Sequence, residues 1–207
     1  MNTMNYIQAS QNGLNQFQSF CNELLYPEDS FALESINLKG IPAKVKNVIE
    51  SIGRLIKTLL EKIKSIFSRS KTFQMPYDVY KEGIDLDNFI AKETQKAMRG
   101  ETPDMDSVFK RYNALRNSSQ RIGNGGKPVT LAESTITQRA RSIQDTYNTV
   151  VKAINVMNGK PLPPSYGAKM DNYLYAAKLL QHRIMIYTYF MSFFNEKVTV
   201  EQMLVLQ

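Results

Sequence analysis

Residues whose side chains could do chemistry are few in this chain of 207 residues. His182 is the only histidine and Cys21 is the only cysteine. Nucleophilic catalysis needs a base beside its nucleophile, and a structural zinc site needs several thiolate or imidazole ligands. Nothing pairs His182 with a serine or cysteine, so we predict a half-buried or surface helical histidine. We predict no enzyme activity, no cofactor and no small-molecule substrate, although a carboxylate-based activity leaves little trace in a sequence.

Two Asp-x-Asp pairs and one glycine cluster are the remaining candidates. Asp85 with Asp87, and Asp104 with Asp106, offer carboxylates that suit a hard cation. Acidic side chains are also favoured near helix N-termini, and we choose that interpretation for both pairs. In residues 122–128, IGNGGKP, the lysine is not followed by the Ser or Thr of a phosphate-binding loop. We therefore predict a flexible loop between two helices there.

The positive charge is concentrated in residues 42–71. This stretch holds eight Lys or Arg and two Glu, a net charge of +6 out of +7 for the whole chain. Apolar residues recur in it every three or four positions, which is typical of one helix face. The contact face that we predict consists of Val45, Ile49, Ile52, Ile56, Leu59, Ile63 and Ile66. The lysines that border this face, and that we assign to the same contact site, are Lys44, Lys46, Lys57, Lys62 and Lys64.

Three interpretations of this basic amphipathic helix compete. The first is a helix that packs into the protein's own core, with the aliphatic parts of its lysines covering the edges. The second is a contact with a protein partner or a second copy, because the apolar spacing is that of a coiled-coil seam. The third is an anionic surface, where we favour a membrane over nucleic acid because lysines beside an apolar stripe suit an interfacial helix. Protein contact or self-assembly is the partner that we predict first.

The rest of the sequence predicts an all-α fold of about six helices. Helical spacing dominates, and no run of residues alternates as a half-buried strand would. Thr102 and Thr130 are predicted N-caps, the latter in a capping box with Glu133. We predict a connector at residues 72–85. The predicted helices cover residues 5–25, 42–68, 86–99, 103–122, 130–158 and 168–195, with a short capped helix at 200–206.

We predict two parts in the chain. Residues 1–75 form an N-terminal arm that carries the basic helix, and residues 76–207 form a helical bundle. Residues 184–194 are apolar almost all round, which predicts a central position or an oligomer contact. The remaining predicted contact residues come from this segment and are Tyr187, Phe190 and Phe194.

The segment from residue 31 to residue 71 resembles a known kind of protein. It begins with FALESINLKGI and continues into the Lys-rich amphipathic helix. This pairing resembles segments of uncharacterised virion-associated proteins of large tailed bacteriophages. The resemblance implies a non-enzymatic structural or packaged component of a virion, and it carries no functional residues onto this chain.

These observations together give a predicted function. We expect a non-enzymatic structural or assembly protein, a component of a phage particle, that acts through helix-mediated protein contacts. The alternative is a peripheral membrane protein that docks on anionic surfaces through residues 42–71. Residues 1–22 carry no charged side chain, and the apolar stretch at 184–194 is shorter than the roughly 18 residues of a membrane span. We therefore expect no signal peptide, no transmembrane span, and a location in the cytoplasm of a host cell or in the virion.

Overall fold

The structure, a computed structural model, describes residues 43–120, 128–157 and 165–205. Helices make up most of these residues, which confirms the predicted all-α class. The described part holds five helices rather than about six; the helix predicted at 5–25, Cys21 and the glycine cluster lie outside it. The helices are α2 (Ala43–Phe67), α3 (Tyr77–Arg99), α4 (Met105–Gln120), α5 (Glu133–Met157) and α6 (Ser165–Val205), and the strands are β1 (Thr72–Pro76) and β2 (Pro128–Ala132).

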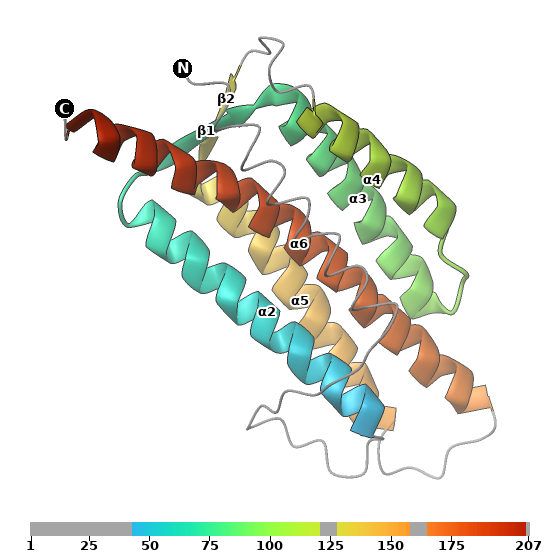
Figure 1. Ribbon diagram of the computed structural model, residues 1–207. Helices are drawn as coiled ribbons and strands as arrows, with labels where there is room; N and C mark the ends of the chain where they lie inside the picture. Colours follow the sequence, from blue (N-terminus) through green and yellow to red (C-terminus); the bar gives the residue numbers. More distant parts are fainter. Residues whose placement is uncertain (1–42, 121–127, 158–164, 206–207) are drawn as a thin grey trace.

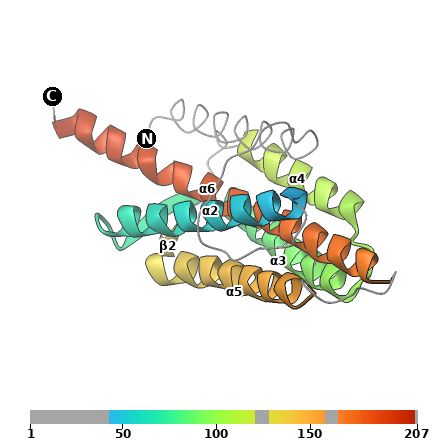
Figure 2. The same ribbon diagram turned by 90° about the horizontal axis from the view of Figure 1, so that it is seen from below.

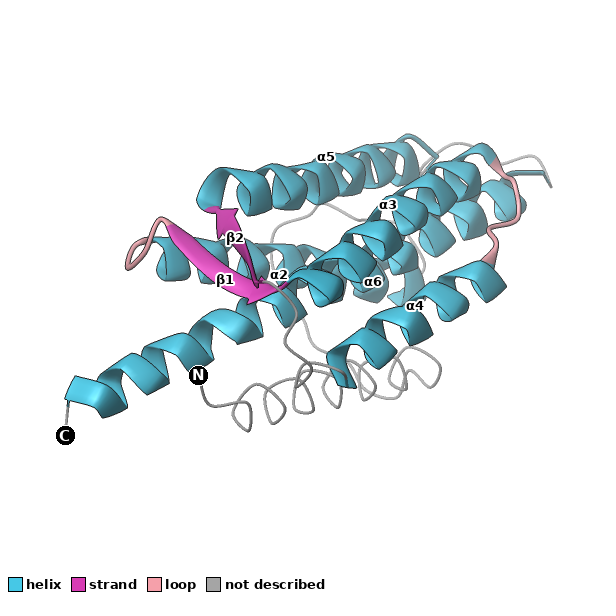
Figure 3. Cartoon of the chain, turned by 90° about the horizontal axis from the view of Figure 1, so that it is seen from above, coloured by secondary structure: helices cyan, strands magenta, loops and turns pink. Residues whose placement is uncertain are grey.

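Helix α6 lies at the centre of the described part of the chain. In Figure 1 it runs diagonally between α2 and α5 on one side and α3 on the other, and it contacts all three. Helices α3 and α5 run antiparallel to α6, whereas α2 runs parallel to it. Figures 2 and 3 place α4 and α5 on opposite sides of the molecule. The main contact of α4 among the described elements is with α3, so α4 is an outer helix.

The composition of α6 explains its central position. Runs of two or three consecutive residues are buried between Ala176 and Phe194. A helix that is apolar on every side has to be covered on every side, and each fully buried large apolar side chain contributes about 1.5–3 kcal/mol. The central position predicted for residues 184–194 is therefore confirmed. Helix α6 continues to Val205, so the separate short helix predicted at 200–206 is instead the end of α6.

A short strand, β1, occupies the start of the predicted connector. It pairs antiparallel with β2, and its residues Phe73 and Met75 are buried while their neighbours are not. This is the two-residue alternation of a strand with one buried face. Five residues show that alternation too briefly to stand out beside long helical patterns. The connector predicted at residues 72–85 is wrong, because β1 and the first part of α3 occupy this segment.

The capping box predicted before α5 is also wrong. Thr130 lies in β2, where it pairs with Gln74, and α5 begins only at Glu133. The backbone N–H of Glu133 donates to the carbonyl oxygen of Lys71 over 3.2 Å. Backbone pairing with a strand distant in sequence therefore takes the place of the local Thr130 cap.

Helix α3 begins at Tyr77, whereas the sequence predicts its start near residue 86. Glycine at position 83 lowers the helical propensity of this stretch, but it also allows α3 to approach α6 closely. A Cβ atom on Gly83 would lie 2.4 Å from Cζ of Phe190. The end of α3 is as expected, because Gly100 takes the left-handed conformation, with φ 84°, that terminates helices.

The N-cap of α4 is Asp104 rather than the predicted Thr102. The backbone N–H of Ser107 donates to Asp104 Oδ1 over 3.0 Å, and the Ser107 hydroxyl donates to Oδ2 over 2.6 Å. An N-cap side chain usually accepts a hydrogen bond from the backbone N–H of the second or third residue of the helix, as Asp104 does here. These two hydrogen bonds lower the pKa of the Asp104 carboxyl. Asp106 lies in the first turn of α4, as predicted.

The predicted division of the chain at residue 75 does not match the packing. Helix α2 contacts α5 and α6, and β1, which includes residue 75, pairs with β2. The apolar face of α2 is therefore completed by helices from the region predicted to be a separate bundle. Residues 43–75 share one core with the later helices, while residues 1–42 lie outside the described residues.

Candidate functional site

A buried carboxylate, Asp87 of α3, is the centre of the main polar cluster in the core. Asp87 is completely buried, and Arg183 of α6 is 3% exposed. The Nε–H of Arg183 donates to Asp87 Oδ1 over 2.7 Å, and the Tyr187 hydroxyl donates to Oδ2 over 2.6 Å. Arg139 of α5 reaches Oδ2 over 3.4 Å and donates over 2.7 Å to Asn88. We call these five residues the Asp87 cluster, and it joins α3, α5 and α6.

The groups of the Asp87 cluster satisfy one another. Removing a carboxylate from water costs several kcal/mol, which a paired cation and hydrogen bonds offset. Burial raises the pKa of Tyr187, and the charge of Asp87 and the hydrogen bond to it raise that pKa further. Tyr187 therefore stays protonated and remains a donor. Because donors from three residues of the chain occupy the carboxylate, its direct role is to hold three helices in register.

The interpretation of Asp85 and Asp87 as helix N-terminal charges is wrong. Helix α3 begins at Tyr77, so both residues lie well inside the helix. Asp85 is exposed while Asp87 is buried, and the two carboxylates do not form a common site. Within the described residues, no group of three or more His, Cys, Asp and Glu side chains could hold a metal ion.

The sequence interpretation missed Arg139 and Arg183 as members of a polar cluster. A signal was present, because Arg183 lies three residues after Leu180 and four before Tyr187, in the middle of an apolar helix face. A charged residue in such a position is seldom buried without a partner. The partner itself could not be found this way, because Asp87 lies 96 residues earlier in the chain.

A second buried carboxylate, Glu93, fixes the turn between α3 and α4. Glu93 is 1% exposed. Its Oε2 accepts the backbone N–H of Asp104 over 2.6 Å, and its Oε1 accepts from Lys96 Nζ over 2.8 Å. The hydrogen bond to Glu93 raises the pKa of Lys96. This carboxylate positions the start of α4 against α3.

A polar contact also joins α2 to α5. The hydroxyl of Tyr147 donates to the carbonyl oxygen of Ile49 over 3.1 Å. A Cβ atom on Gly53 would lie 2.6 Å from that hydroxyl oxygen, so the glycine makes room for it. Burial, and secondarily the charge of the buried Glu50, raise the pKa of Tyr147 to about 12. Tyr147 is therefore a structural donor at neutral pH.

The apolar contact face predicted on α2 lies in the protein's own core. None of its seven residues is more than 7% exposed: Val45, Ile49, Ile52, Ile56, Leu59, Ile63 and Ile66. This corrects the prediction that these residues meet a partner or a lipid surface. The physical reason is that α5 and α6 supply apolar faces of matching length within the same chain. For the apolar face of this basic helix, the interpretation that it packs into the protein's own core therefore holds.

The three aromatic contact residues predicted in α6 are buried as well. Tyr187 and Phe190 are 0% exposed and Phe194 is 5% exposed. The rings of Tyr187 and Phe190 pack edge to face with centroids 5.7 Å apart. Phe194 packs edge to face on Phe73 of β1 at 6.3 Å. These rings form core contacts, so this prediction of a contact surface is corrected too.

The lysines predicted to be part of the contact site lie at the surface, unlike the apolar residues of α2. Lys44, Lys46, Lys57 and Lys64 are exposed, and Lys62 is half-buried. Lys57 lies 4.0 Å from Glu61, with both side chains mostly in solvent. An exposed pair of this kind is worth less than about 1 kcal/mol. The lysines are thus available on the surface of α2, while its apolar face is not.

His182 is half-buried on α6, as predicted. Burial lowers its pKa to about 4. The imidazole is therefore neutral at physiological pH.

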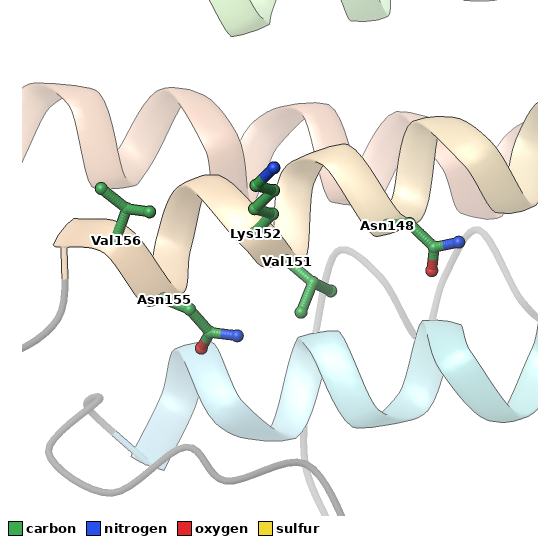
Figure 4. Close-up of a pocket in the computed structure, with 5 residues that line it drawn as sticks. All are labelled: Asn148, Val151, Lys152, Asn155 and Val156. Carbon is green, nitrogen blue, oxygen red and sulfur yellow. The ribbon is translucent and has the colours of Figure 1, made fainter.

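Two shallow hollows lie along the outer face of α5. The first, shown in Figure 4, has a volume of about 370 Å³, and the second a volume of about 550 Å³. All the residues that line them come from α5; those of the first are Asn148, Val151, Lys152, Asn155 and Val156. Ligand sites usually gather polar groups that converge from several elements. Side chains on the outer face of one helix diverge instead.

Comparisons with known proteins give no relative. No protein-family model, curated protein or solved structure matches this chain. In the part of the chain that the structure describes, no helix has the length and apolar character needed to cross a membrane.

Proposed function

We propose that this protein is a non-enzymatic structural or assembly protein, a component of a phage particle, built as a helical bundle. It acts through protein contacts made by its outer helices. The resemblance of residues 31–71 to virion-associated proteins supports the particle assignment. The Asp87 cluster supports a scaffold role, because its buried charges are used to hold α3, α5 and α6 together.

The protein-contact proposal rests on the exposed outer face of α4. This helix has its main described contact with α3, strengthened by the guanidinium of Arg111 over the ring of Phe89 at 4.6 Å. Phe109 of α4 is 49% exposed, whereas most large apolar side chains of the described residues are buried. Aromatic residues, including Phe, are enriched in protein interfaces, where they bury a large apolar area. We propose that Phe109 anchors the contact.

Size-exclusion chromatography with light scattering, over a range of protein concentrations, tests self-assembly. The wild-type protein is expected to form dimers or larger species as concentration rises, and Phe109→Ser to remain monomeric. The matched control is Tyr77→Ser, because Tyr77 is 50% exposed but lies on α3. A wild-type protein that is monomeric at every concentration, or equal effects of the two substitutions, would contradict the proposal.

The alternative function, docking on anionic membranes through residues 42–71, has weaker support. An interfacial helix binds by burying its apolar face in the lipid headgroup region. That face of α2 is covered by α5 and α6. Only the charge of this segment remains available for contact with an anionic partner.

A further inference from the structure

A local excess of positive charge lies at the C-terminal end of α2 and in the turn after it. The second half of this helix and the turn after it carry five basic residues and one acidic residue, Glu61, within fifteen positions. We call the five basic residues the basic patch: Lys57, Lys62, Lys64, Arg69 and Lys71. Four of them are exposed, Lys62 is half-buried, and α2 forms one edge of the molecule in Figure 1.

This charge is not neutralised within the described part of the protein. Lys57 has a distant ion pair with Glu61 at 4.0 Å, and the other four members have no ion pair with a described residue. Like charges held this close repel one another and attract anions. A net charge of about +4 over fifteen positions therefore favours an anionic partner with several charges.

Hydroxyl groups are interleaved with the basic patch. Ser65, Ser68, Ser70 and Thr72 are all exposed. The Ser68 hydroxyl donates to the carbonyl oxygen of Ser65 and the Ser70 hydroxyl to that of Thr72, so the single protons of these two hydroxyls are used inside the turn. Lysine, arginine, serine and threonine are the side chains that proteins use most to contact phosphate oxygens. The basic side chains, and not these two hydroxyls, are therefore the donors that this segment offers to phosphates.

The absence of exposed apolar residues in the patch argues against insertion into a bilayer and against stacking on single-stranded bases. The exposed large apolar residues of the described chain are Tyr77, Phe109, Val156 and Tyr175, and none lies on α2 or its exit turn. Insertion into a bilayer needs such an anchor, and stacking on single-stranded bases needs aromatic rings. Contact with the outside of a duplex needs neither, because phosphates alone supply the binding free energy.

We propose that the basic patch docks on the phosphate backbone of double-stranded nucleic acid without reading its sequence. The helical part of the patch, residues 57–67, is about 15 Å long. A DNA duplex presents about nine phosphates over that length, counting both strands. The duplex thus presents more phosphates over that length than the patch has cations. This docking function is separate from the protein contact through Phe109.

Fluorescence anisotropy with a short labelled DNA duplex of arbitrary sequence tests the proposal. With about four phosphate contacts, the binding constant should fall on the order of 100-fold between roughly 50 and 200 mM salt. The variant Lys57→Glu with Lys64→Glu should bind at least about tenfold more weakly at the lower salt concentration. The neutral variant Lys57→Gln with Lys64→Gln should lose less than the charge reversal but in the same direction.

The matched control is Lys92→Glu with Lys152→Glu. It changes the net charge equally on exposed lysines of α3 and α5 and should retain binding within about twofold. No binding to the duplex, or equal losses for the patch and control variants, overturns the proposal. Binding to vesicles of acidic phospholipid but not to the duplex also overturns it, in favour of a lipid surface. Because Phe109→Ser leaves the patch intact, failure of the self-assembly test does not affect this result.

Discussion

Asp87 is the residue whose loss should affect this protein most. Asp87→Asn keeps the shape of the side chain but removes the charge that Arg183 and Arg139 face. Leaving a buried guanidinium without its counter-charge costs about 3–5 kcal/mol, so the variant should be strongly destabilised. Urea unfolding followed by circular dichroism measures the free energy of unfolding. Asp85→Asn, an exposed neighbour on α3, is the control and should stay within about 0.5 kcal/mol of the wild type. Equal effects of the two substitutions would show that the Asp87 pairing contributes no stability.

His182 should make the stability depend on pH below neutrality. Its pKa is lowered to about 4 by burial, against an ordinary value of about 6.5 in the unfolded chain. Between these values the unfolded state binds a proton that the folded state does not, so the free energy of unfolding falls as pH falls through this window. The contribution is fully present only above about pH 7.5, and about 2 kcal/mol of it should be lost by about pH 5.

Replacement of this histidine provides the check. His182→Gln should flatten the dependence over that pH range when unfolding is measured in urea at each pH. Carboxylates with lowered pKa values, such as Asp104, are present in both proteins. Their contribution to the pH dependence of stability is therefore the same in both and cancels in the comparison. Identical slopes for the two proteins would exclude His182 as the source.

At the scale of elements, the contact between α3 and α6 depends on the absence of a side chain at Gly83. A Cβ atom there would lie 2.4 Å from Phe190 Cζ, closer than packed atoms allow. Gly83→Ala should therefore destabilise the fold by about 1–3 kcal/mol, although alanine is the better helix former. Thermal melting measures the change. The double variant with Phe190→Leu should recover part of the loss, and a more stable Gly83→Ala protein would be the contrary result.

The elements with long apolar stripes were predictable from sequence, and the short ones were not. The stripes of α2 and α5 repeat over 25 residues each, so their periods identify both helices and the predicted ends of α2 lie within one residue. Strand β1 has five residues, and it is held by pairing with β2 more than fifty residues later. Thr130 illustrates the limit: its local pattern is a capping box, yet pairing with Gln74 overrides it.

At the scale of the whole molecule, the sequence predicts which residues of α2 are apolar but not what covers them. A heptad-spaced face suits the protein's own core, a partner helix or a membrane equally well. The choice depends on whether α5 and α6 can reach it, which is a property of the complete fold. The same reasoning applies to the candidate site. No member of the Asp87 cluster has a local sequence pattern that marks it as part of a site, and only the packing of three helices brings the members together.

Native-state hydrogen exchange should show that α2 belongs to the central unit of the fold and that α4 does not. Helices α2, α3, α5 and α6 share one set of buried residues, so their slowest amides should exchange with the free energy of global unfolding. Helix α4 buries only Val108 and Leu115 among its large apolar residues and has its main described contact with α3, so it should open at a lower free energy. Exchange read by mass spectrometry on peptides from each helix distinguishes the two groups, and Val108→Ala should speed exchange in α4 while leaving α2 unchanged. If α2 exchanged faster than α6, residues 43–67 would instead behave as the separate arm that the sequence predicts.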